Sequence, residues 1–150
     1  MYESQGTNVL NEAEVIAAIR RAKEEYLRDI ENDVPTPKAA FNYACALVRS
    51  KNKQELEKAI EIFTVLIDEG FQTHKCIYNI SYAYYKLGRL RQSRLFCERL
   101  LKLDPLNEQA QDLHQKLDAI VQSKGIVGLG ITAVVAAAAA IVLYKAMGKK

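Results

Sequence analysis

The sequence predicts an all-α protein in which six helices form a superhelical bundle and one further C-terminal helix crosses a membrane. Apolar residues recur at intervals of three and four through residues 11–124, and no segment shows the sustained alternation of a strand. Capping residues, prolines and glycines divide this part of the chain into six segments. Twenty consecutive residues without a charge then follow, from Gly125 to Tyr144.

The chain begins with a predicted flexible arm, residues 1–10, which is mostly polar and has no sustained period. A first helix is expected over residues 11–31. Asn11 is placed to cap it, with Glu14 three residues later as its capping-box partner. One apolar stripe follows at helical spacing, made of Val15, Ile19, Ala22, Tyr26 and Ile30.

Two helices are expected in the next forty or so residues. Thr36 is a predicted N-cap and Pro37 occupies the first position of a helix that runs to about Ser50. Asn52 and Glu55 repeat the capping-box spacing and begin the next helix, which ends near Gly70.

Three more helices complete the bundle. Thr73 begins the fourth and Gly88 ends it, and the fifth continues to about Leu103. Pro105 interrupts the pattern, so the sixth helix is expected over residues 107–122.

An internal repeat explains this arrangement. Phe41, Ala44, Cys45 and Val48 recur 36 residues later as Ile77, Ile80, Ser81 and Tyr84, and Ala59, Phe63 and Leu66 recur 34 residues later as Ser93, Cys97 and Leu100. The second copy matches the tetratricopeptide pattern, with Tyr84 and Pro105 at its Tyr and Pro places. We therefore predict tetratricopeptide-like repeats at about 38–73 and 74–107, capped by the helices at 11–31 and 107–122.

The uncharged stretch at 125–144 is long enough to cross a membrane, because twenty helical residues span roughly 30 Å. Lys145, Lys149 and Lys150 lie in the short basic tail that follows, residues 145–150, and we expect them to direct targeting. A C-terminal span of this kind is typical of a tail anchor, which leaves residues 11–124 as a cytosolic domain. Gly128, Thr132, Ala136 and Ala140 form a small-residue ladder that would allow the anchor to self-associate, so a homo-oligomer is one expected state.

Charge excludes one class of partner. Three of the 21 Lys and Arg residues lie in the basic tail, so residues 1–124 carry 18 basic and 18 acidic side chains. A neutral domain does not suit nucleic-acid binding. Within it, residues 1–37 are acidic and residues 75–102 are basic, so the two regions could attract each other. The basic set is expected to be a solvated helix face, with contact to acidic headgroups or to the acidic N-terminal region as the alternative, and it consists of Arg89, Arg91, Arg94, Arg99 and Lys102.

No catalytic or cofactor motif is present, so no metal, no cofactor and no enzymatic activity are predicted. His74 and Cys76 are two residues apart, but no second pair has metal-ligand spacing. Cys45, Cys76 and Cys97 lie in apolar contexts typical of reduced core thiols, although a Cys-His hydrolase that assembles in space stays an alternative.

A partner-binding groove is predicted on the concave side of the bundle. The helical angle of about 100° per residue places Tyr78, Tyr82 and Tyr85 together, away from the packing stripe of their helix. The equivalent side of the second helix presents Asn42, Ala46 and Arg49. Tyrosines beside an arginine suit recognition of a helix or an extended segment. The alternative is that the tyrosines pack under the first helix or the N-terminal arm, which would then either compete with a partner or assist its binding.

The run FNYACALVRS at residues 41–50, a second repeat with YYKLG at 84–88, and a C-terminal anchor ending in lysines resemble the mitochondrial fission 1 protein family. Cys45 stands where that family usually has Trp, and Ala83 where it often has Gly. The resemblance implies a tail-anchored tetratricopeptide-like adaptor of the mitochondrial outer membrane and of peroxisomes. It also implies recruitment of a dynamin-related GTPase, directly or through adaptor proteins, for organelle fission. A receptor for chaperones or import precursors is the alternative, for which Asn42, Arg49 and Asn79 would have to hold a carboxylate.

Overall fold

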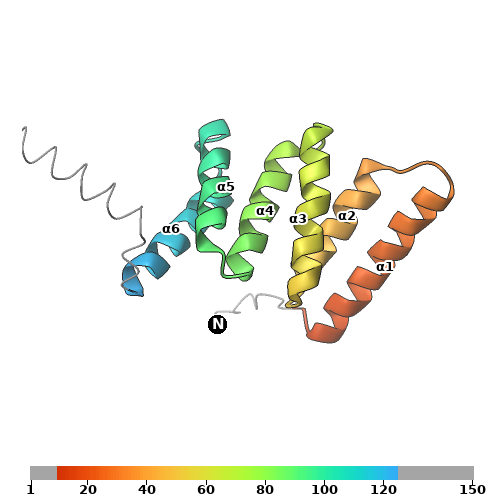
Figure 1. Ribbon diagram of the computed structural model, residues 1–150, viewed down its shortest axis with the longest axis horizontal. Coiled ribbons are helices and arrows are strands. Elements are labelled where there is room, and N and C mark those ends of the chain that lie inside the picture. Colours follow the sequence, from red (N-terminus) through yellow and green to blue (C-terminus); the bar gives the residue numbers. More distant parts are fainter. Residues whose placement is uncertain (1–9, 125–150) are drawn as a thin grey trace, which may run out of the picture.

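The computed structural model describes residues 10–124, which form six helices joined by short turns (Figure 1). All six predicted helices are present, and no strand occurs in this range. The helices are α1 (Glu12–Glu31), α2 (Pro37–Val48), α3 (Lys53–Asp68), α4 (Thr73–Lys86), α5 (Leu90–Leu103) and α6 (Glu108–Ser123).

The predicted signal at the start of α1 acts as expected, and α6 also begins at a capping residue. Asn11 and Glu14 form a complete capping box, in which Asn11 Oδ1 accepts from the Glu14 amide at 2.9 Å and Glu14 Oε2 accepts from the Asn11 amide at 2.9 Å. Asn107 caps α6 by accepting from the amide of Ala110 at 3.0 Å. The starts of α1 and α6 are therefore fixed by residues close by in the chain.

Two other predicted caps differ from expectation. Thr36 is the N-cap residue of α2, but its hydroxyl donates to Asp29 of α1 at 2.5 Å and makes no capping bond. Asn52 caps α3 as predicted, yet Glu55 does not complete the box, because the Ser50 hydroxyl donates to its carboxylate and accepts from the Asn52 amide. The capping residues of these helices therefore also join neighbouring segments.

The turn between α4 and α5 depends on Gly88, whose φ of +72° lies in the left-handed region. A side chain at this φ would strain the backbone although the space around its Cβ position is open. The Gly88 amide donates to the carbonyl of Tyr85 at 3.0 Å, which closes the end of α4.

The core has two parts, with α4 shared between them. The first is formed mainly by α2, α3 and α4, and Phe63 and Ile80 at its centre are wholly buried. The second is formed by α4, α5 and α6 around Ile77, Cys97 and Leu100. The two parts are continuous, since Tyr82 packs against both.

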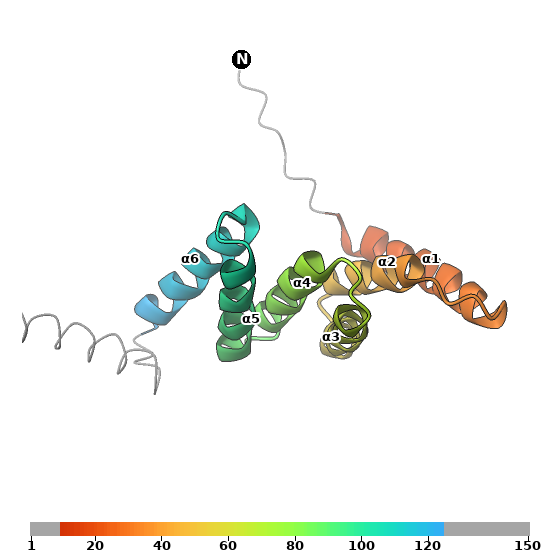
Figure 2. The ribbon, with the colours of Figure 1, turned by 90° about the horizontal axis from the view of Figure 1, so that it is seen from above.

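The array of helices is curved. Within residues 10–124, the backbone of α4 comes close to those of both α2 and α6, whereas the backbones of α3 and α5 do not come close to each other. Figure 2 shows α3 and α5 on one side of the array and α2, α4 and α6 on the other. Because the helices are closer together on the side of α2, α4 and α6, that side is the inner surface of the bend.

The position of α1 contradicts one expectation from charge. In the described part of the chain α1 packs only against α2, so its acidic residues do not meet the basic residues of α5. Two basic side chains find carboxylates closer by: Arg89, the N-cap residue of α5, lies 2.7 Å from Glu57 of α3, and Arg94 of α5 lies 2.9 Å from Asp118 of α6. The prediction of one solvated basic face is wrong for these two arginines, which bind α3 and α6.

Several predictions fall outside the described residues. They concern the N-terminal arm, the membrane-spanning stretch at 125–144 and the basic tail at 145–150. Between residues 10 and 124, no helix has both the length and the apolar character that a membrane crossing requires.

Candidate partner-binding surface

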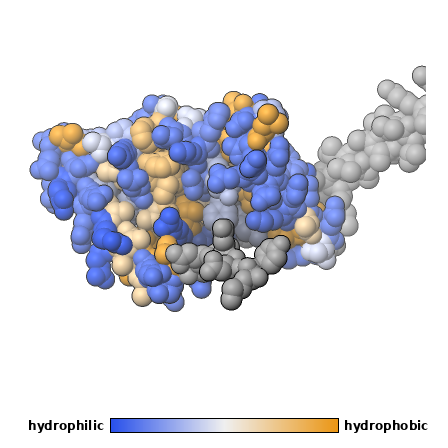
Figure 3. All heavy atoms as spheres, turned by 180° about the vertical axis from the view of Figure 1, so that it is seen from behind, coloured by the Kyte–Doolittle hydropathy of each residue, from blue (hydrophilic) through white to orange (hydrophobic). Residues whose placement is uncertain are grey.

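A cleft runs between α1 and α2 on the inner surface. Its main part has a volume of about 410 Å³ and is lined by Ala18, Arg21, Ala22, Glu25, Asn42, Cys45, Ala46 and Arg49. No residue of α3 lines it, whereas a separate pocket of about 320 Å³ between α1 and α2 is lined by α3 and so faces the outer side. Small side chains from both helices leave the cleft open. Figure 3 shows this face of the molecule, on which a pale apolar band is visible.

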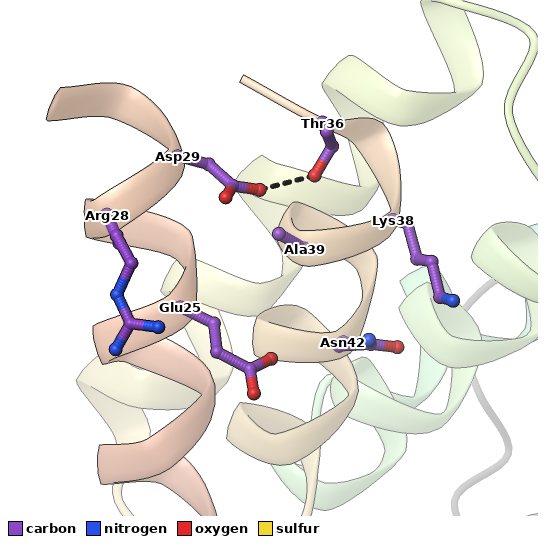
Figure 4. Close-up of a pocket in the computed structure, with 7 residues that line it drawn as sticks. All are labelled: Glu25, Arg28, Asp29, Thr36, Lys38, Ala39 and Asn42. Atoms are coloured by element: carbon purple, nitrogen blue, oxygen red, sulfur yellow. Dashed lines mark hydrogen bonds between the residues drawn. The ribbon is translucent and has the colours of Figure 1, made fainter. Parts of the chain in front are cut away.

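The cleft continues toward the α1–α2 turn as a second hollow of about 300 Å³ (Figure 4). Glu25 and Asn42 line both parts, which makes them one trough, called here the α1–α2 cleft. The Thr36 hydroxyl and Asp29 carboxylate bond across its upper end. Four basic side chains line the cleft against two carboxylates: Arg21, Arg28, Lys38 and Arg49 against Glu25 and Asp29.

Three tyrosines form a ladder along α4. The rings of Tyr78 and Tyr82 stack with centroids 6.2 Å apart, and those of Tyr82 and Tyr85 stack at 6.0 Å. All three are half-buried, because one side of the ladder packs against the core shared by α4, α5 and α6. Burial, together with the neighbouring Tyr82 and Asp112, raises the pKa of the Tyr78 phenol.

Lys86 connects the ladder with α2. Its ammonium group lies 5.9 Å from the centroid of the Tyr82 ring, within the range of a cation–π interaction. The same group donates to the carbonyl oxygens of Val48 and Ser50 at the C-terminal end of α2. This residue carries no signal of its own in the sequence, because the contact joins positions far apart in the chain.

The structure therefore places the six predicted groove residues in two groups. Asn42, Ala46 and Arg49 line the α1–α2 cleft, with Asn42 and Arg49 exposed and Ala46 buried at its floor. The tyrosine ladder of Tyr78, Tyr82 and Tyr85 does not line the cleft, and it packs instead against the core shared by α4, α5 and α6. The α1 side of the cleft was not predicted, although Ala18 and Ala22, one turn apart, are a sequence signal for close helix approach.

The carboxylate clamp of a chaperone receptor is not assembled. Asn79 donates one of its two side-chain N–H groups to the carbonyl of Lys75 in its own helix at 2.8 Å. It also lines neither part of the α1–α2 cleft, where Asn42 and Arg49 lie.

The three thiols are poor candidates for nucleophiles. Burial raises the pKa of Cys45 to about 11, of Cys76 to about 12 and of Cys97 to about 11. A thiol with such a pKa stays protonated at neutral pH, and the thiolate is the reactive form. Within residues 10–124, no three His, Cys, Asp or Glu side chains come close enough to hold a metal ion.

Both repeats match models of known protein families. Residues 38–70 match the Fis1 N-terminal tetratricopeptide repeat, and residues 74–126 match the Fis1 C-terminal tetratricopeptide repeat. The mitochondrial fission 1 protein of Debaryomyces hansenii is 33% identical over 102 residues, which cover 67% of each chain. That of Tuber borchii is 32% identical over 114 residues, which cover 73% of this chain and 74% of the relative.

Solved structures agree in fold. A crystal structure of yeast Fis1 in complex with an Mdv1 fragment containing N-terminal extension and coiled coil domains superposes with a TM-score of 0.64 at 19% identity. The match covers 71% of this chain and 84% of that one. Fis1 proteins are tetratricopeptide adaptors without enzymatic activity, which confirms the prediction that the chain is not an enzyme. From its two repeats and its relatives, the chain belongs to the mitochondrial fission 1 protein family.

Proposed function

We propose that the chain is a tail-anchored adaptor of the mitochondrial outer membrane that promotes mitochondrial fission. Its cytosolic domain recruits a dynamin-related GTPase, directly or through an adaptor protein, and the same domain serves peroxisomes. Membership of the fission 1 family supports this function, as does the complex of yeast Fis1 with an Mdv1 fragment. The anchor at residues 125–144 is part of the proposal and is supported by the uncharged length of that stretch.

The inner surface is the proposed binding site, and the α1–α2 cleft is the observation that carries it. Ala18, Ala22 and Ala46 provide an apolar floor, and arginines and Lys38 stand at its rim. An extended or helical segment with small apolar side chains and flanking acidic residues would complement both features. The tyrosine ladder offers a second contact on the same surface, with rigid rings already ordered by stacking.

A pair of matched variants of the full chain tests the site. In Asn42→Asp/Arg49→Glu two exposed cleft residues gain negative charge. In Gln92→Glu/Arg99→Glu two exposed residues of α5 change charge equally, away from the cleft. Proximity labelling from anchored protein in cells should show loss of the fission machinery for the first variant and retention for the second. Equal labelling by both variants would place the binding surface elsewhere.

The N-terminal arm is the remaining element of the proposed mechanism. If residues 1–10 compete for the inner surface, their deletion should strengthen partner binding, and if they form part of the surface, deletion should weaken it. The measurement is the affinity of one purified partner for the full chain and for the deletion variant. An unchanged affinity would remove the arm from the mechanism.

A further inference from the structure

Charged residues are sorted between the two ends of the helices. Successive helices run in opposite directions, so the last turns of α2, α4 and α6 lie along one edge with the first turns of α3 and α5 (Figure 1, lower edge). Three contacts join these ends: Lys86 with the Val48 carbonyl, Arg89 with Glu57, and Arg94 with Asp118.

This edge is basic. Five exposed cations lie on it without an ion pair to any of residues 10–124. One is Arg49, which also lines the α1–α2 cleft, and the other four, called here the basic edge, are Lys51, Lys53, Arg91 and Lys124. The carboxylates nearby are already engaged, because Glu57 pairs with Arg89 and Glu55 accepts from Ser50. Glu12 and Glu14 lie at the same end of the array but on α1, at the side opposite α6.

The opposite edge carries the other sign. Its turns expose five carboxylates, which belong to Glu31, Asp33, Asp68, Glu69 and Glu108. Arg28, Lys38, Lys75 and Lys102 are exposed there too, and none of them makes an ion pair within the described range. The domain therefore has a charge gradient parallel to its helices.

The chain continues from the basic edge. α6 ends at Ser123, and Lys124 leads directly into the uncharged stretch at 125–144. A membrane that held this stretch would lie next to the edge, and an anionic surface acts over about 10 Å at 0.1 M salt. A lysine or arginine within that range favours contact with such a surface by about fivefold.

We propose that the basic edge docks on the anionic phospholipid surface of the membrane in which the chain is anchored. The helices would then stand on the membrane, with the acidic edge away from it and the inner surface open to the side. A partner approaching along the membrane would meet the α1–α2 cleft without displacing lipid. This inference rests on the membrane anchor of the proposed function and adds a fixed orientation to it.

Hydrogen–deuterium exchange of the full chain in nanodiscs tests the docking. Discs of phosphatidylcholine alone are compared with discs that also contain phosphatidylserine. Amides of residues 49–53 and 87–91 should exchange several-fold more slowly in the anionic discs, whereas residues 68–75 and 103–108 should not differ. Raising the salt concentration from about 0.1 M to about 1 M shortens the screening length to about 3 Å and should abolish the difference.

Two charge-reversal variants complete the experiment. Lys51→Glu/Lys53→Glu/Arg91→Glu should lose the slowing, and the fold should survive because negative charge is favourable near the starts of α3 and α5. Lys38→Glu/Lys75→Glu/Lys102→Glu makes the same change in net charge on the opposite edge. This variant should keep the slower exchange in anionic discs. Circular dichroism verifies that both variants stay helical.

The outcomes separate the inference from the function on which it rests. If the full chain does not enter nanodiscs, the anchor is wrong and the docking falls with it. If the chain enters both kinds of disc and residues 49–53 and 87–91 exchange at the same rate in both, the docking alone is overturned. Equal loss of slowing in both variants would also overturn it, because the effect would then depend on net charge and not on the edge.

Discussion

The ammonium group of Lys86, at the end of α4, donates hydrogen bonds to the carbonyl oxygens of Val48 at 2.5 Å and Ser50 at 2.6 Å. These carbonyls lie at the C-terminal end of α2, where the helix dipole favours a cation. Lys86 of the second repeat thus supplies hydrogen-bond donors to the C-terminal end of α2, the first helix of the first repeat. Its ammonium group also lies beside the ring of Tyr82.

Replacing Lys86 with Met should destabilise the domain. The change keeps the length of the aliphatic part of the side chain but leaves two part-buried carbonyls without their charged donor, which costs about 1–3 kcal/mol in the free energy of unfolding. Urea unfolding measures the effect. Lys102→Met, at an exposed position, is the control and should stay within about 0.5 kcal/mol of the parent. Equal stability of both variants would mean that the two hydrogen bonds contribute nothing.

A reciprocal serine pair holds α4 against α5. The Ser81 hydroxyl donates to the Ser93 carbonyl at 2.6 Å, the Ser93 hydroxyl donates to the Ser81 carbonyl at 2.7 Å, and both residues are wholly buried. Each serine-to-alanine change should cost about 1 kcal/mol. Because the two hydroxyls are in contact, the double variant should cost less than the two single changes together. Simple additivity in urea unfolding would show that the hydroxyls act independently.

The buried thiols should make the domain sensitive to alkali. Their pKa values are raised from 9.0 to about 11 for Cys45 and Cys97 and to about 12 for Cys76, so the folded chain keeps these protons to higher pH than the unfolded chain. The resulting contribution to stability is complete below pH 9.0 and is lost as the pH rises through 11 to 12. Thiolate absorbance should appear near pH 11 in the native chain and near pH 9.0 in guanidinium. Coincident titrations would contradict the burial of the thiols.

The anchor prediction concerns the residues beyond α6. A chain that ends at Lys124 should be soluble and highly helical, whereas the full chain should stay with membranes during alkaline extraction. Replacing Lys145, Lys149 and Lys150 with Glu should divert the full chain from mitochondria to other membranes or to the cytosol. Microscopy and fractionation measure both effects. Recovery of the full chain in the soluble fraction would exclude the anchor, and unchanged mitochondrial targeting would exclude the tail charge as the address.

The sequence by itself determined the helices, because their ends depend on neighbours in the chain. The Asn11 and Glu14 capping box, the Pro37 start and the Gly88 turn each act within a few residues, so a pattern of residue types suffices to place them. The repeat could also be recognised from the sequence, because burial constrains the same positions in each copy. Positions such as Ile80 and Phe63 must be buried in every copy of a helix pair, and both are wholly buried here.

Only the tertiary structure decided which polar groups meet. Helical spacing grouped Tyr78, Tyr82 and Tyr85 correctly, but their half-burial depends on where α6 packs. The summed charges of two regions suggested an attraction that α1 does not make within residues 10–124, since α1 packs against α2 while Arg89 and Arg94 pair with Glu57 and Asp118. Side-chain hydrogen bonds and ion pairs act over a few ångströms, so their partners are set by the approach of helices that the chain places far apart in sequence.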